Sequence, residues 1–149
     1  MVKERPAPVA GSCLCGRVRF EVDRLIGPFE LCHCSRCRKV TGSAFAATVG
    51  AMAEDFRFLG GEEAIRGIIL PVLERPPAYR VTFCGDCGSA LPEPPESGYF
   101  EIPAGLLDGD PGLAPDKHIY VEHNATWHTI TDDLPRFTAA EIAVHRAKA

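Results

Sequence analysis

The seven cysteines of this 149-residue chain fall into three short clusters, and no cysteine lies outside them. The clusters are a C-x-C pair at Cys13 and Cys15, a C-x-C-x-x-C triplet at Cys32, Cys34 and Cys37, and a C-x-x-C pair at Cys84 and Cys87. Two thiolates spaced C-x-x-C can both face one ion at about 2.3 Å, as in a zinc knuckle. The C-x-C spacing needs a turn or a distorted strand end, which the flanking Gly11 and Gly16 can supply. The pattern predicts thiolate-bound metal.

Seven thiolates divide most naturally into a group of four and a group of three. A structural zinc takes four protein ligands and is closed, whereas a catalytic zinc keeps three and leaves the fourth position to water or substrate. We therefore expect one closed site from the two outlying pairs and one open site from the triplet. Spacing alone leaves open an alternative in which His33 or an acid is the fourth ligand of the triplet site. Both sites would then be structural. A redox pair at Cys84 and Cys87 is less favoured, because no βαβ pattern surrounds it.

Basic and small residues surround the triplet. Arg36, Arg38 and Lys39 can offset an anionic thiolate cluster or bind a substrate carboxylate, or they form a solvated basic turn. The run 41–43, Thr-Gly-Ser, can place backbone amides or a hydroxyl near a pocket, or it forms a plain turn. Because His33 lies between two candidate ligands, its side chain is expected to point away from the metal.

Histidine, tryptophan and aspartate residues near the C-terminus are interpreted as structural. His118, His123 and His128 lie in a strand-like stretch and are expected to pack in the core or on the surface. Trp127 is expected to anchor the core, with the wall of a substrate pocket as the alternative. The acidic pair 132–133 precedes Leu-Pro and is typical of a turn.

Length and charge narrow the classes of protein. One domain over residues 1–149 is expected, because domains usually hold about 100 to 200 residues. A formal net charge of −4 argues against a nucleic-acid or membrane-surface partner. An odd number of cysteines argues against a framework of disulfides. The first twelve residues contain no apolar signal segment, and no apolar run reaches the roughly 18 residues of a membrane span. We expect a soluble cytoplasmic protein with reduced thiols.

The hydrophobic period along most of the chain is two, which indicates strands. Alternation is clearest at 18–22, 45–49, 56–58, 79–83, 100–102 and 119–121, and thirteen prolines and fourteen glycines separate these runs. A predominantly antiparallel β domain is therefore predicted. One helix is predicted from about Ala139 to Arg146, because Thr138 and Glu141 form a capping box and Phe137 and Ile142 a hydrophobic staple. No chemical role is expected for this helix.

Four blocks, in order, carry a resemblance to a known family. They are GSCLCGRVRFEV, CHCSRCRKVTGSAFAA, FCGDCGSAL and HIYVEHNATWHTITDDLPRF, spanning about residues 11–137. The sequence resembles the glutathione-dependent formaldehyde-activating enzyme family, also called the Gfa or centromere-protein-V family. The resemblance implies a β-tent fold of antiparallel sheets with zinc knuckles. It also implies a structural zinc on Cys13, Cys15, Cys84 and Cys87 and a catalytic zinc on Cys32, Cys34 and Cys37.

The resemblance further implies a carbon–sulfur lyase that joins a thiol such as glutathione to formaldehyde or another small aldehyde. An open zinc with three thiolates suits this chemistry, because a substrate thiol bound at the fourth position loses its proton and becomes a nucleophile. Two zinc ions per chain and a small-molecule thiol or aldehyde are thus the expected cofactors and partner. The alternative is a non-catalytic zinc module that binds a protein.

Overall fold

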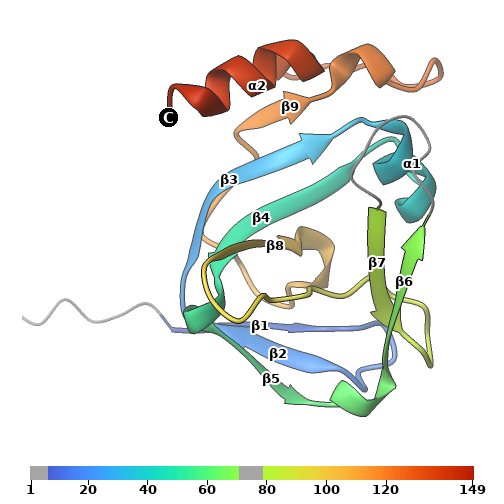
Figure 1. Ribbon diagram of the computed structural model, residues 1–149, viewed down its shortest axis with the longest axis vertical. Helices are drawn as coiled ribbons and strands as arrows, with labels where there is room; N and C mark the ends of the chain where they lie inside the picture. The colour runs from blue at the N-terminus through green and yellow to red at the C-terminus, as the bar shows by residue number, and fades with distance from the viewer. Residues whose placement is uncertain (1–6, 71–78) are drawn as a thin grey trace, which may run out of the picture.

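A computed structural model describes residues 7–70 and 79–149 of the chain. Three sheets and two short α-helices make up the described fold (Figure 1). The elements are β1 (Val9–Ser12), β2 (Arg19–Val22), β3 (Leu25–Cys32), α1 (Ser35–Thr41), β4 (Ala46–Met52), η1 (Ala53–Asp55), β5 (Phe56–Gly60), η2 (Glu62–Ala64), β6 (Ile65–Leu70), β7 (Tyr79–Cys84), β8 (Tyr99–Pro103), η3 (Ala104–Leu106), β9 (Lys117–Ile119), η4 (Val121–His123), β10 (Arg136–Phe137) and α2 (Ala139–Ala147), where η denotes a 3-10 helix.

The strands pair in a mainly antiparallel arrangement. One sheet has the order β1-β2-β5, the largest has the order β10-β9-β3-β4-β8, and β6 pairs with β7. The expected mainly β fold with a short C-terminal helix is confirmed. The pairs β3–β9 and β9–β10 are parallel, so the largest sheet is mixed.

Period-two alternation divides the two faces of the largest sheet. Phe29 on β3, Val49 on β4 and Ile102 on β8 face the main core, together with Phe20 and the other buried residues of β2, β4 and β8. The intervening residues of the same strands point to the opposite face. The helix α2 covers part of that second face (Figure 1). The cysteine triplet lies on this face.

The predicted C-terminal helix forms, one residue longer than expected. Thr138 caps it, accepting from the backbone N–H of Glu141 while the Glu141 side chain accepts from the N–H of Thr138, so the capping box is confirmed. Ile142 is buried against Cys32, Cys34 and Ile119, and Phe137 packs beside this cluster. The packing fixes a nine-residue helix that is marginal in isolation.

The strand expected through Val121 ends earlier. Tyr120 adopts a left-handed conformation with φ of 58°, and residues Val121–His123 form a 3-10 helix. A non-glycine residue in this region cannot continue an extended strand. Across residues 7–70 and 79–149, the structure contains no helix with both the length and the apolar composition that crossing a membrane requires.

Candidate metal centres

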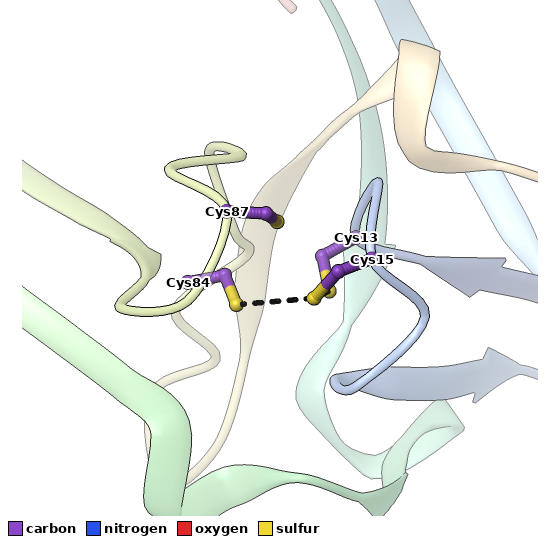
Figure 2. A group of neighbouring side chains, drawn as sticks. All are labelled: Cys13, Cys15, Cys84 and Cys87. Atoms are coloured by element: carbon purple, nitrogen blue, oxygen red, sulfur yellow. Dashed lines mark hydrogen bonds between the residues drawn. The ribbon is translucent and has the colours of Figure 1, made fainter.

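Four cysteines from two separate turns meet at one centre (Figure 2). Cys13 and Cys15 lie in the turn after β1, while Cys84 ends β7 and Cys87 lies in the turn that follows. All four Sγ atoms lie within 4.8 Å of one another. The Sγ atoms of Cys13 and Cys15 are 3.5 Å apart, and those of Cys15 and Cys84 are 3.9 Å apart.

These separations fit a tetrahedral thiolate site. A Zn–S distance of about 2.3 Å at tetrahedral angles places neighbouring sulfurs about 3.8 Å apart, whereas a disulfide needs about 2.05 Å. All seven cysteines are free thiols. The two outlying pairs therefore come together as the sequence led us to expect, and their donor set suits a soft, tetrahedral cation such as zinc.

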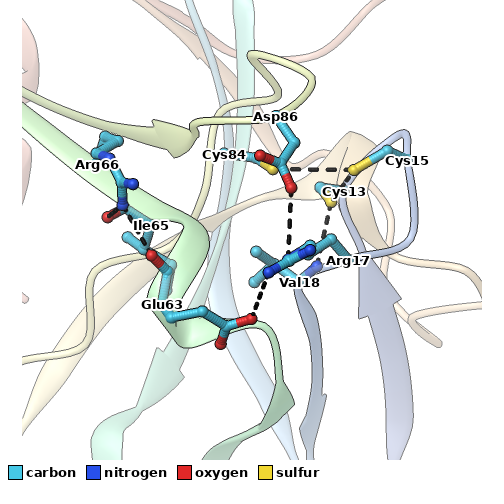
Figure 3. A network of polar contacts seen from close by, with 9 residues as sticks. All are labelled: Cys13, Cys15, Arg17, Val18, Glu63, Ile65, Arg66, Cys84 and Asp86. Atoms are coloured by element: carbon cyan, nitrogen blue, oxygen red, sulfur yellow. Dashed lines mark hydrogen bonds and ion pairs between the residues drawn. The ribbon is translucent and has the colours of Figure 1, made fainter.

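Polar contacts tie the two turns together (Figure 3). Arg17, just after the first turn, pairs through Nε with the Asp86 carboxylate of the second turn at 3.4 Å and through Nη2 with Glu63 at 2.9 Å. Ser89 accepts a hydrogen bond from the N–H of Leu14 at 2.9 Å, and its Oγ lies 3.3 Å from the Cys87 Sγ. The Ser89 hydroxyl is the main cause that lowers the pKa of the Cys87 thiol to about 6, which favours the metal-binding thiolate.

The triplet occupies the junction between β3 and α1. Cys32 ends β3, Cys34 is the N-cap of α1, and Cys37 lies in its first turn. Their Sγ atoms lie within 4.8 Å of one another, and the backbone N–H of Cys37 donates to the Cys34 Sγ at 3.4 Å. The backbone N–H groups of the first helical turn and the helix dipole at this end favour negative charge on sulfur.

Crowding makes the three thiols compete for one negative charge. Contacts with the sulfurs of Cys32 and Cys37 lower the pKa of the Cys34 thiol. Contacts with the sulfurs of Cys34 and Cys37, together with burial, raise the pKa of the Cys32 thiol. Three thiolates this close repel one another unless a cation lies between them. The donor set therefore fits a divalent metal ion here as well.

No fourth His, Cys, Asp or Glu ligand atom among the described residues joins the triplet. His33 points away, as expected, with its Nε2 at 2.7 Å from the Nδ1 of His118. A cavity of about 230 Å³ borders the three sulfurs instead. The described geometry thus offers four sulfurs at one centre and three sulfurs beside a cavity at the other.

The cavity is built on the second face of the largest sheet. Glu30 on β3 precedes Cys32 by two residues, so the two side chains share this face with Thr48 on β4 and Glu101 on β8. Arg146 of α2 reaches the same cavity and pairs with the buried Glu30 at 2.6 Å between Nη2 and Oε2. The C-terminal helix therefore lines the cavity, a position that the sequence did not indicate.

Tyr79 and Arg36 form another wall of the cavity. The Tyr79 hydroxyl lies 4.0 Å from the Cys37 Sγ, and the Arg36 guanidinium lies 5.1 Å from the centre of the Tyr79 ring. Burial and the neighbouring Cys37 raise the pKa of Tyr79, so this hydroxyl keeps its proton. Of the three basic residues in and around the triplet, Arg36 lines the cavity, whereas Lys39 is exposed and Arg38 is absent from the lining.

A polar chain of two buried histidines and the exposed Asp132 lies behind the triplet. His33 contacts His118, whose Nε2 lies 3.0 Å from the Asp132 Oδ2. Desolvation, followed by the charge of His118, lowers the pKa of His33 to about 4, so its imidazole is neutral at pH 7. Asp132 also accepts from the Leu134 N–H at 3.0 Å, which confirms its turn role and adds a contact that the sequence did not reveal.

The histidines lie in the core or at the surface as expected, with His118 buried, but the expectation for Trp127 is not met. Trp127 is 71% exposed, so the prediction that it anchors the core is wrong. Its ring instead meets His128 edge-on with centroids 6.3 Å apart, and His128 stacks on His33 at 6.0 Å. His123 lies exposed at the end of η4.

The sequence signals that pointed to the missed cavity residues are weak. Glu30 interrupts an apolar run in β3, and Glu101 lies between the core residues Phe100 and Ile102. Each pattern places a carboxylate on a face opposite the core, yet an exposed strand face gives the same pattern. Tyr79 and Arg146 carry no local signal at all.

The sequence and the fold are similar to those of known proteins. The sequence model of the glutathione-dependent formaldehyde-activating enzyme family matches residues 8–123, which include all seven cysteines but not β10 or α2. A Halomonas elongata protein named for the same family is 33% identical over 125 residues, which cover 78% of this chain and 77% of that protein. A crystal structure of a Rhodobacter sphaeroides protein has a TM-score of 0.50 at 23% identity, covering 68% of this chain and 89% of that one, and supports the fold alone. The chain belongs to the glutathione-dependent formaldehyde-activating enzyme family.

Proposed function

We propose that the protein is a zinc-dependent carbon–sulfur lyase that adds a thiol, such as glutathione, to a small aldehyde or cleaves the adduct. The observation that carries the proposal is the difference between the two centres: four sulfurs face one another, whereas three sulfurs border a cavity. Cys13, Cys15, Cys84 and Cys87 would hold a structural zinc, and Cys32, Cys34 and Cys37 a catalytic zinc. Such a zinc would lower the pKa of a substrate thiol and hold it as a thiolate.

The reaction itself is balanced without any other reagent. The sulfur electron pair forms a bond to the aldehyde carbon, the carbonyl π pair moves to oxygen, and a proton taken up by oxygen replaces the one lost from the thiol. The developing negative charge on oxygen is the part that the protein must stabilise.

Three side chains of the cavity can assist these charge movements. The Tyr79 hydroxyl, 4.0 Å from the Cys37 Sγ, can donate a hydrogen bond to the carbonyl oxygen. Glu101 is exposed as a whole residue, but desolvation of its carboxyl group and the charge of Glu30 raise its pKa. The raised pKa favours the protonated carboxyl group, which can donate a proton to the carbonyl oxygen. Arg146 keeps N–H donors at the cavity wall, where they can bind a substrate carboxylate.

Metal analysis combined with X-ray absorption tests the proposal. We expect two zinc ions per chain and an average zinc environment richer in sulfur when glutathione is added. The rates of hemithioacetal formation and breakdown, measured by NMR exchange, should exceed the uncatalysed rates. Two zinc ions that each keep four protein ligands, with no acceleration, would instead support a non-catalytic module that binds a protein.

A further inference from the structure

A second, larger cavity lies beside the thiolate cavity. It has a volume of about 550 Å³, against about 230 Å³ for the thiolate cavity. The two cavities share Ala46, Thr48 and Tyr79 as lining residues, so they meet at a common wall. We call the larger one the apolar chamber and define it by Phe45, Ala47, Ala90, Pro103 and Leu106 together with that shared wall.

The linings of the two cavities differ in charge. Glu30, Glu101, Arg36 and Arg146 line the thiolate cavity, whereas none of the described residues that line the apolar chamber is charged or is a histidine. A charged group moved into such a lining would lose its hydration without gaining a partner. Glutathione carries carboxylates and an ammonium group, so its charged ends suit the thiolate cavity rather than the chamber.

The position of the chamber points to the part of a substrate that it can take. Tyr79 separates the two cavities, and its hydroxyl is 4.0 Å from the Cys37 Sγ. A group that enters the chamber therefore starts next to the site where sulfur and carbon join. Pockets that enclose small organic molecules usually measure about 300 to 1,000 Å³, a range that the chamber meets and the thiolate cavity does not.

We infer that the apolar chamber binds an uncharged hydrocarbon substituent on the aldehyde, so that this chain acts on adducts of aliphatic or aromatic aldehydes larger than formaldehyde. The inference rests on the proposed function for the reaction itself. The turn with Cys84 and Cys87 also supplies Gly88, Ser89 and Ala90 to the chamber. The four-sulfur centre thus shapes one wall of this binding site.

Turnover of matched aldehydes tests the inference. We expect kcat/KM to be at least about 10-fold higher for hexanal than for acetaldehyde with 2-mercaptoethanol, because hydrophobic pockets discriminate by about that factor or more for added methylenes. Ala90→Leu, which fills part of the chamber, should lower the hexanal-to-acetaldehyde ratio. Ala143→Leu on the exposed side of α2 makes the same change away from both cavities and should leave the ratio as in the wild type. Equal kcat/KM values for the two aldehydes would overturn the inference.

A binding measurement separates this inference from the proposed function. NMR titration of the metal-loaded wild-type protein with hexanal and 2-mercaptoethanol should shift the methyl signals of Leu106 and Ala90, whether or not turnover occurs. If no aldehyde is turned over, the proposed function fails while these shifts still decide the chamber. Shifts produced by hexanethiol with acetaldehyde, but not by hexanal with 2-mercaptoethanol, would assign the chamber to the thiol and overturn our inference.

Discussion

Ile142→Ala tests whether α2 holds the triplet in place. The Ile142 side chain is 2% exposed and packs in a cluster with Cys32, Cys34 and Ile119. In the same helix, Val144 is 53% exposed and provides a matched control. The two truncations thus differ in burial rather than in helix context.

The expected magnitude follows from the buried carbons. Ile→Ala removes three carbon atoms, worth about 0.8 kcal/mol each in transfer free energy, and the cavity left behind adds to this. We expect Ile142→Ala to lower the free energy of unfolding by about 3 kcal/mol and Val144→Ala by about 0.5 kcal/mol. A domain with about 5 to 15 kcal/mol of stability remains folded after either change.

Urea denaturation of the metal-loaded protein measures these differences, and chelator competition measures the consequence for the site. Because Ile142 packs on two triplet cysteines, its truncation should speed metal release from one of the two centres only. Costs for the two truncations that agree within about 1 kcal/mol, or equally faster release from both centres, would refute the reasoning.

Three further predictions follow from the same structure. Cys84→Ser should abolish folding, because the binding free energy of structural zinc in small domains, about 10 to 16 kcal/mol, exceeds or matches the stability of a typical domain. Cys34→Ser should lose one zinc and the activity but stay folded. Metal analysis and circular dichroism check this, and equal loss of soluble protein in the two variants would contradict it. Burial lowers the pKa of His33 from 6.5 to about 4, so the folded state resists its protonation and the free energy of unfolding should fall as the pH drops from about 6.5 to 4. NMR titration of the His33 imidazole should give a midpoint near 4, and a midpoint near 6.5 would disprove the burial argument. Gly61 has φ of +83°, and a Cβ added there would lie 2.0 Å from the Arg17 carbonyl oxygen, so Gly61→Ala should lower the free energy of unfolding by more than about 3 kcal/mol. At Gly16, where φ is +74° and the space is open, the same change should cost about 1 kcal/mol. Denaturation curves that show equal costs would contradict this.

Features encoded within a few residues could be predicted from the sequence. The cysteine spacings predicted two thiolate groups, and the Thr138–Glu141 spacing predicted the start of α2. Both depend on local geometry: how far a side chain reaches across one turn, and which backbone groups a cap satisfies. The period-two pattern identified strands for the same reason, and it failed at Val121 because Tyr120 turns the backbone.

Contacts between distant segments could not be predicted in this way. Arg146 and Glu30 are separated by 116 positions, and His33 and His118 by 85. Each of these side chains has an ordinary local context, so only the fold reveals its partner. The exposure of Trp127 is a similar case, because an aromatic side chain is buried only where the fold places a core beneath it.

The difference between the two centres has a topological origin. The four-sulfur centre takes two cysteines from the turn after β1 and two from the turn after β7, so the donors approach from two sides. The triplet takes all its donors from residues 32–37, and a segment of this length reaches one side of an ion. Its opposite side is lined by side chains of β4, β8 and α2, none of which brings a fourth ligand atom to the described triplet. Supplying every sulfur from one strand–helix junction is thus what leaves one side of this centre open to the cavity.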